Sequence, residues 1–316
     1  MDPRLKAIAA QCGAFLRREA LALGYDDRAI AKQVSRGAWV RVRTGAFVPA
    51  DVWASLDDVG RRRVVVKAAL RTVRTHVVVS HTSAADALGA AVWELPDDVH
   101  LTRTDGRAGR SAAGIKQHRG GVRVDDVTRR EGRLITSGTR TALDITTIAD
   151  VEHSLVTVND LIHRGETSQD LLVHALETRT YWPHSLTSDL VVRLADGRVE
   201  SVGESRVLFL CWAQGIPMPI PQYEVKDRSG HVIARVDFAW PELGVFLEFD
   251  GKVKYEHFLR PGESVTDAVL REKQREQLVC ELTGWRCIRI VWADLYQPER
   301  TAARIRALFR PSSIIA

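Results

Sequence analysis

A run of six residues, Val245-Phe246-Leu247-Glu248-Phe249-Asp250, places two carboxylates inside an otherwise apolar segment. Its length and its content of Val and Phe predict a β-strand. Successive side chains of a strand point to opposite faces of a sheet, so Glu248, Asp250 and Lys252 are expected on one face. The apolar residues between them point the other way. The segment therefore requires a sheet with a core on one face and an acidic site on the other.

The segments around this strand predict an α/β domain with a mixed central sheet. Expected helices cover residues 204–214, 264–283 and 297–309, and expected strands cover 222–225, 232–238, 245–249 and 285–292. Three strands between two helices, followed by a fourth strand and a further helix, are typical of a sheet flanked by helices.

Asp237 ends the strand that precedes the acidic segment, and a short connection predicts a hairpin that brings it beside Glu248 or Asp250. Packed carboxylates repel one another, and a hard divalent cation such as Mg²⁺ or Mn²⁺ relieves that repulsion. Glu204, on the preceding helix, is a candidate for a further ligand. A bound metal would polarise a phosphate oxygen and acidify a water, and Lys252 would stabilise the developing charge. The alternative is that these acids are solvated strand-edge charges next to an Asp-Gly turn.

The first 50 residues carry the whole net charge of the chain, which is +5. Nine Lys and Arg face four Asp and Glu there, so the rest of the chain is neutral. Two short helical patterns lead to a third helix, which begins at Asp26 or Asp27 and ends near Gly37. Strands at 39–43 and 46–48 then form a hairpin. Three small helices followed by a hairpin are the plan of a winged helix.

Five cations and no acid occur between residues 28 and 43. Three of them lie at helical spacing on one face of the third helix, and two lie on one face of the hairpin strand: Arg28, Lys32, Arg36, Arg41 and Arg43. A basic helix of this kind fits the major groove of double-stranded DNA, with the hairpin at neighbouring phosphates. The alternative is a solvated basic surface.

The remaining segment predicts a middle α+β region. Helices are expected from Ser80 and from Arg140, and residues 151–195 are expected to be mostly helical. The histidines have no ligand spacing and are interpreted as packing or capping residues: His81, His100, His118, His153 and His163. The expected multi-domain α/β organisation is therefore a winged helix at 1–50, a middle domain at 51–198 and a C-terminal domain at 199–316.

The C-terminal residues resemble the PD-(D/E)XK nuclease superfamily, and its branch of very-short-patch-repair (Vsr-like) endonucleases in particular. Glu204, Asp237 and the run Glu248-Phe249-Asp250-Gly251-Lys252 carry the resemblance. It implies a restriction-endonuclease-like sheet and metal-dependent hydrolysis of phosphodiester bonds. Val236 stands where the superfamily often has Pro. Either Asp250-Gly251-Lys252 is the (D/E)XK element, or Glu248 is the main ligand with Lys252 shifted by two positions.

The N-terminal residues resemble AbiEi-like antitoxins of type IV toxin–antitoxin systems. The stretch from Gly24 to Val48 resembles their winged-helix region, and the stretches at 80–85 and 140–144 resemble their middle region. This resemblance implies DNA binding and repression of the chain's own operon. A cognate toxin or a second copy of the chain is then a candidate partner.

These observations leave two main hypotheses. One is a Mg²⁺- or Mn²⁺-dependent DNA endonuclease that its winged helix delivers to duplex DNA. The other is an antitoxin-like regulator whose nuclease-like domain does not cut. An RNA-directed or repair nuclease ranks third, because the sequence shows no aromatic stacking platform. On the long charged helix, Arg271, Gln274 and Arg275 are candidates for contact with a DNA backbone, although such residues more often form a solvated face.

Composition limits the remaining classes. An apolar fraction of 45% and a charged fraction of 27% are ordinary for a globular protein and exclude a mainly disordered chain. No apolar stretch is long enough for a membrane span, and no signal peptide is visible. The four cysteines have neither disulfide nor zinc spacing, so a cytoplasmic location is expected.

Overall fold

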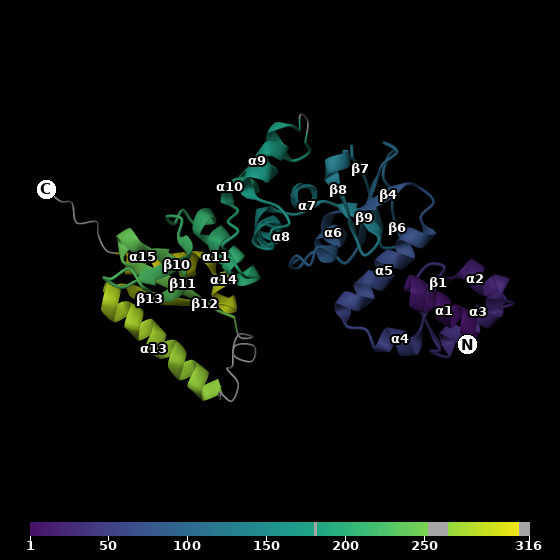
Figure 1. Cartoon of the computed structure of the whole chain (residues 1–316), viewed down its shortest axis with the longest axis horizontal. Helices are drawn as coiled ribbons and strands as arrows, with labels where there is room; N and C mark the ends of the chain where they lie inside the picture. The colour runs from purple at the N-terminus through teal and green to yellow at the C-terminus, as the bar shows by residue number, and fades with distance from the viewer. Residues whose placement is uncertain (180–181, 252–264, 310–316) are drawn as a thin grey trace. The chain divides into compact units, whose positions relative to one another are not determined.

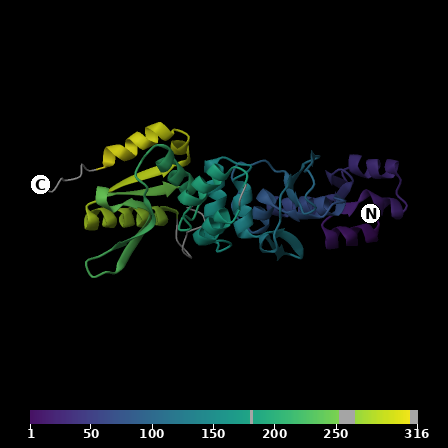
Figure 2. The same cartoon turned by 90° about the horizontal axis from the view of Figure 1, so that it is seen from above.

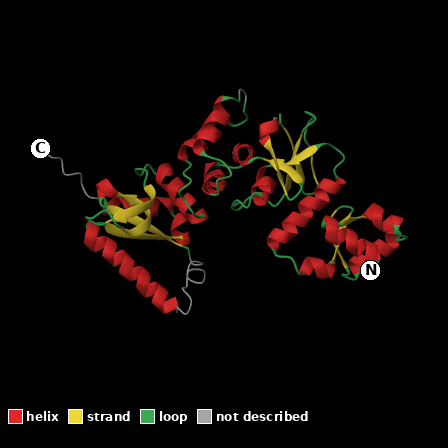
Figure 3. Ribbon diagram, in the orientation of Figure 1, coloured by secondary structure: helices red, strands yellow, loops and turns green. Residues whose placement is uncertain are grey.

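The computed structural model describes residues 1–179, 182–251 and 265–309. The chain divides into two compact units, residues 1–145 and residues 146–316. Each unit combines helices with at least one sheet (Figure 3), so the chain is of mixed α/β class, as the sequence predicts. None of the helices in these ranges combines the length and the apolar character that a bilayer crossing needs.

The first unit begins with three helices and a three-stranded sheet. Its elements are α1 (Pro3–Cys12), β1 (Phe15–Leu16), α2 (Arg17–Ala22), α3 (Asp27–Ser35), β2 (Trp39–Arg43) and β3 (Ala46–Pro49). The carboxylate of Asp26 accepts a hydrogen bond from the N–H of Ala29 and caps α3, which ends just before Gly37 at a left-handed φ of 70°. Phe15 and Phe47 pack against Trp39 in the core of this part, with ring centroids 4.7 and 6.1 Å away.

The rest of the first unit is a six-stranded mixed sheet with helices. Two helices, α4 (Ala50–Ala54) and α5 (Asp58–Thr72), connect it to the N-terminal part, and Val64 and Ala68 of α5 pack on Leu16 and Val48. The strands are β4 (Val77–Val79), β5 (Val99–Arg103), β6 (Ser111–Ala112), β7 (Ile115–Arg119), β8 (Val127–Arg130) and β9 (Arg133–Thr136), in the order β6-β7-β5-β4-β9-β8. Two helices, α6 (His81–Ala87) and α7 (Gly138–Ile145), contact each other beside the sheet.

The second unit begins with helices that the sequence analysis assigned to the middle region. They are α8 (Val151–His163), α9 (Gln169–Glu177) and α10 (Ser185–Leu194). Helix α8 packs on α11 (Val202–Ala213): Asn159 donates a hydrogen bond to Ser205, and Arg206 pairs with Glu152 at 2.7 Å. The compact unit therefore extends N-terminally to these helices.

A four-stranded sheet forms the body of the second unit (Figures 1 and 2). It contains β10 (Ile220–Lys226), β11 (Val232–Trp240), β12 (Val245–Asp250) and β13 (Arg286–Val291), accompanied by α13 (Val265–Thr283), α14 (Trp292–Leu295) and α15 (Pro298–Leu308). Strands β10, β11 and β12 run antiparallel, and β13 runs parallel to β12. From α11 to β13 the helices and strands follow the predicted order, and the sheet is mixed as predicted.

Different helices cover the two faces of this sheet. Neighbouring residues of β12 point to opposite faces and therefore contact different helices. Phe246 packs with Val236 and with Val279 of α13. On the other face the ring of Phe249 lies against Gly203 of α11, where an added Cβ would lie 1.9 Å from a ring carbon. The acidic end of β12 thus lies in a sheet between α11 and α13.

Candidate functional site

Glu204 lies in the first turn of α11 and is buried, with 2% of its surface exposed. Its carboxylate accepts hydrogen bonds from the N–H of Glu200 at 3.0 Å, the hydroxyl of Ser201 at 2.7 Å and the amide of Gln222 at 2.9 Å. Burial raises the pKa of Glu204, the negative charge of Asp237 raises it further, and the three hydrogen bonds partly offset this rise. A capping function for α11 accounts for the bonds to Glu200 and Ser201, but not for burial next to a second carboxylate.

Asp237 takes part in the pairing of β11 with β12 through its side chain. In the main-chain register, Phe238 of β11 pairs with Leu247 of β12. Asp237, the residue before Phe238, accepts the N–H of Phe249 with its side-chain carboxylate at 2.7 Å. On the other side of β11, Gln222 of β10 has a left-handed φ of 50°. Such a backbone is strained for a residue other than glycine and is frequent at functional sites. Here it brings the Gln222 amide to Glu204.

Glu248 is buried at 6% exposure and is held by a cation from α13. Arg275 donates one hydrogen bond to the Glu248 carboxylate at 2.7 Å and another to the carbonyl of Arg235 at 2.5 Å. From the sequence, Arg275 is a candidate for a DNA contact or for part of a solvated face. Its position shows that it neutralises a buried acid, a pairing across 27 residues that local spacing does not predict.

Asp250 is the last residue of β12 and is half-buried. Lys252 lies outside the described residues, so the choice between the two alignments of the (D/E)XK element stays open.

The four carboxylates are brought onto adjacent elements but not into a closed cage. Glu204 and Asp237 interact electrostatically, and Asp237 is bonded to the residue after Glu248. No three of the four carboxylates place their oxygens within 4.8 Å of one another. Two of these carboxylates are engaged by other groups. Arg275 binds one oxygen of Glu248, and three hydrogen-bond donors surround Glu204.

The donor chemistry nevertheless fits a hard divalent cation. The available atoms are carboxylate oxygens, which Mg²⁺ and Mn²⁺ prefer. The raised pKa of Glu204 reflects a negative charge that burial and Asp237 both disfavour, and a nearby cation would stabilise that charge.

The basic residues of the N-terminal part lie on its surface. Arg28, Lys32 and Arg36 are exposed on or beside α3, and within the described residues none of the three forms an ion pair. Arg41 of β2 is also exposed and lies over the ring of Phe47 at 5.8 Å. Arg43 differs, because the strand pairing shifts between Arg41 and Arg43, and burial lowers the pKa of Arg43. Arg43 is therefore the least accessible of the five predicted DNA contacts.

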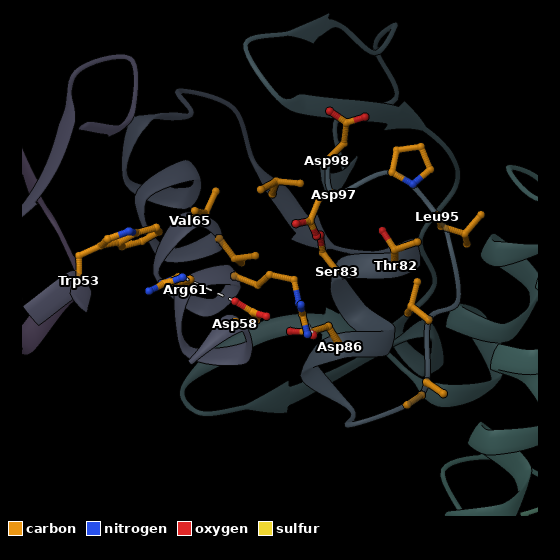
Figure 4. A pocket seen from close by; sticks show the side chains of 17 residues that line it. Trp53, Asp58, Arg61, Val65, Thr82, Ser83, Asp86, Leu95, Asp97 and Asp98 are labelled. Atoms are coloured by element: carbon orange, nitrogen blue, oxygen red, sulfur yellow. Dashed lines mark hydrogen bonds and ion pairs between the residues drawn. The ribbon is translucent and has the colours of Figure 1, made fainter. Parts of the chain in front are cut away.

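The first unit also contains a cavity of about 740 Å³ between α5, α6 and the loop before β5 (Figure 4). Charged residues at its wall pair with each other: Arg62 bonds Asp86 at 2.9 Å, and Arg61 lies 3.7 Å from Asp58. None of the residues that the sequence singled out as functional lines it. Its paired charges and mixed lining do not specify a ligand.

Comparison with known proteins gives relatives but no function. No family model matches the chain. Two uncharacterized proteins of Mycobacterium tuberculosis, from strains CDC 1551 and H37Rv, are each 28% identical to it over 275 residues. The alignment covers 86% of this chain and 93% of each relative. The similarity therefore extends into both units.

Proposed function

We propose that the chain is a metal-dependent endonuclease that hydrolyses phosphodiester bonds of double-stranded DNA and is recruited by its basic winged helix. The buried Glu204 beside the half-buried Asp237, at the junction of α11, β11 and β12, is the observation that supports this best. A carboxylate that is buried beside a second negative charge, as Glu204 is, serves no packing purpose that an apolar residue would not serve better.

The topology of the second unit agrees with the resemblance to PD-(D/E)XK nucleases. Helix α11, the antiparallel strands β10, β11 and β12, helix α13 and the parallel strand β13 follow in the order expected of a restriction-endonuclease-like core. In the first unit, three helices and the β2–β3 hairpin agree with a winged helix. Both agreements concern the fold, which alone does not determine activity.

In this proposal Glu204, Asp237 and either Glu248 or Asp250 hold a Mg²⁺ or Mn²⁺ ion, and Lys252 stabilises charge on the phosphate. The ion supplies a Lewis acid for the phosphate and a more acidic water. The N–H of Phe249 fixes the Asp237 carboxylate, and Gln222 with the N–H of Glu200 orients Glu204. Glu248 would reach a metal only in place of its ion pair with Arg275, whose guanidinium would then suit a DNA phosphate.

A plasmid-nicking assay tests the proposal. Supercoiled DNA is incubated with the full chain and Mg²⁺ or Mn²⁺, and the relaxed and linear products are quantified. We expect cleavage by the wild type and loss of at least about 100-fold in rate for Asp237→Asn and Glu204→Gln, as for other removals of charge-stabilising groups. Glu224→Gln, at an exposed acid of β10, is the matched control and should cleave normally.

The second candidate is an antitoxin-like DNA-binding regulator without nuclease activity. The ion pair between Arg275 and Glu248 favours it, because a paired carboxylate does not need a metal. It predicts DNA binding by the wild type with no cleavage in either metal, and equal binding by Asp237→Asn. That combination would reject the endonuclease and leave a DNA-binding function with a candidate toxin partner or a homodimer.

A further inference from the structure

Three histidines that the sequence analysis interpreted as packing residues lie together in the first unit. His81 begins α6, and His100 and His118 lie on the neighbouring parallel strands β5 and β7. The ring nitrogens of His100 and His118 are 2.9 Å apart, and the ring of His81 stacks on His118 with centroids 3.7 Å apart. One ring nitrogen from each of the three lies within 4.8 Å of the others.

The burial of this cluster sets its charge state. His81 and His100 are 3% and 2% exposed, and His118 is half-buried. Burial lowers the pKa of all three, to about 4 for both His100 and His118, and neighbouring positive charge lowers it further. Burial therefore favours the uncharged imidazole, which is the form that binds metal ions.

Neighbouring groups orient His81. Its Nδ1 lies 2.9 Å from the hydroxyl of Ser80, which in turn accepts a hydrogen bond from Thr102 at 2.8 Å. The carboxylate of Asp144 lies 3.9 Å from the same nitrogen. Polar groups that engage one ring nitrogen direct the other toward a metal in many protein sites. The backbone of His81 also has a left-handed φ of 52°, a strained conformation for this residue type.

We propose that His81, His100 and His118 form a binding site for Zn²⁺ or a chemically similar transition-metal ion. Imidazole nitrogens suit zinc, nickel, cobalt and copper, whereas Mg²⁺ requires oxygen ligands. Zinc–nitrogen bonds of about 2.0–2.1 Å in a tetrahedral site place two ligand nitrogens roughly 3.3 Å apart. The 2.9 Å between His100 and His118 is close to that spacing, and a nitrogen of His81 lies within 4.8 Å of both. A water molecule or an anionic ligand takes the fourth position.

This site is independent of the proposed nuclease site. It uses nitrogen ligands of the first unit, whereas the candidate carboxylates belong to the second unit. Apolar side chains would pack the same space without the cost of burying polar rings, so mutual packing alone is a weaker explanation.

Metal binding to the full chain, prepared without a polyhistidine tag and freed of metal with EDTA, tests the proposal. Titration calorimetry with ZnCl₂ and elemental analysis after dialysis should give about one zinc per chain, and Co²⁺ should give the visible absorption of a tetrahedral nitrogen site. We expect His118→Gln and His100→Gln to lower the affinity by roughly 100-fold or more, because loss of a group that merely orients a ligand already costs about 10- to 100-fold. His231→Gln, at an exposed histidine of the second unit, should bind like the wild type.

Circular dichroism and thermal melts in EDTA establish that each variant is folded. Should the buried His100 and His118 variants fail to fold, NMR signals of the wild-type histidine rings replace them, and zinc should shift three rings together. Zinc binding that is unchanged in folded His118→Gln and His100→Gln would overturn the proposal. The absence of stoichiometric zinc and of any shift of the three rings in the wild type would overturn it equally.

Discussion

Arg140 of α7 neutralises two buried carboxylates in the first unit. Its guanidinium donates to Asp144 at 2.8 Å and to Asp126 at 3.0 Å, and all three residues are at most 3% exposed. A third hydrogen bond goes to the carbonyl of Gly121 at 2.8 Å. These charges can be buried only because each is paired. An apolar residue of the same size would leave both carboxylates buried without a positive charge beside them.

Replacing Arg140 by Met should therefore destabilise the first unit strongly. The change leaves Asp126 and Asp144 buried without their cation, and breaking a buried pair in this way costs about 3–5 kcal/mol of unfolding free energy. Thermal melts and urea unfolding of the full chain measure the effect. Arg129→Met removes an exposed arginine of β8 and should change the stability by less than about 0.5 kcal/mol. Equal melting of the two variants would contradict this account.

Gly203 gives a second prediction at the level of one residue. Alanine there would gain up to about 1 kcal/mol of helix propensity in α11. Its Cβ, however, would lie 1.9 Å from a ring carbon of Phe249, and overpacking of a core costs about 1–3 kcal/mol. We expect the steric cost to exceed the gain, so that Gly203→Ala lowers the melting temperature. Gly121→Ala, with no atom within 4 Å of its added Cβ, is the control.

The sequence predicts the neighbours of a single residue only where those neighbours lie close to it along the chain. Glu204 and Asp237 lie close enough to interact electrostatically, whereas their role as metal ligands stays a prediction. The partner of Glu248 was not foreseeable, because Arg275 reaches it from another element. The histidine cluster was not predicted for the same reason, because only the pairing of β5 with β7 and the start of α6 bring His81, His100 and His118 together.

At the scale of elements, Asp150 shows how a helix start depends on a single carboxylate. Asp150 caps α8 by accepting the N–H of His153 at 2.9 Å, and the ring of His153 lies at 2.8 Å. Burial alone would raise the pKa of Asp150, but the bonds from His153 outweigh it and hold the pKa below its usual value of about 3.9.

Asp150→Ala should lower the stability of the second unit by about 1 kcal/mol at pH 7, the usual cost of losing such a cap. Because the folded-state pKa is lowered, this contribution is complete above the unfolded pKa and is lost as the pH falls through the folded pKa. The two proteins should therefore converge in strong acid. Melting temperatures between pH 7 and pH 2 measure the difference, and Asp150→Asn should keep most of the cap at neutral pH. A difference that is constant down to pH 2 would contradict the assignment.

Elements with strong periodic patterns were predictable, and short ones were not. The third helix, its end before Gly37 and the following hairpin agree with the expected caps and turns. Strand β12 and the helices on either side of the second sheet also follow from their apolar patterns. Strands β6–β9 were missed, because two to five residues rich in Arg, Lys and Ser carry no recognisable alternation. Sheet pairing stabilises them instead: β7 and β9 pair with β5 and β4, and β6 and β8 pair with β7 and β9.

At the scale of the whole molecule, the net charge is concentrated in one segment of the chain, whereas both units contain a core. The net charge of +5 resides in the first 50 residues, and a sheet with its own core lies in each unit. The order of expected helices and strands predicted the mixed α/β class, which the structure confirms. The assignment of 151–194 to a compact unit with the C-terminal sheet rests on contacts such as Arg206 with Glu152, which sequence spacing does not reveal.

If the exposed cations on α3 bind DNA phosphates, the affinity must depend on salt in a defined way. Each neutralised phosphate adds about 0.9 to the slope of log K against log salt concentration on duplex DNA. Changing Arg28, Lys32 and Arg36 together to Gln should then make the slope shallower by nearly 3 and weaken binding to unrelated sequences to a similar degree. Fluorescence anisotropy with a duplex across a range of NaCl concentrations measures both quantities.

The control must separate a specific surface from total charge. Changing Arg193, Lys226 and Arg300 to Gln removes three exposed cations of the second unit and lowers the net charge by the same amount. Long-range attraction alone would weaken both triple variants equally, because it depends on the charge of the whole molecule. Contact at α3 would leave the slope of this control near that of the wild type, so equal slopes for the two variants would reject α3 as the DNA-binding face.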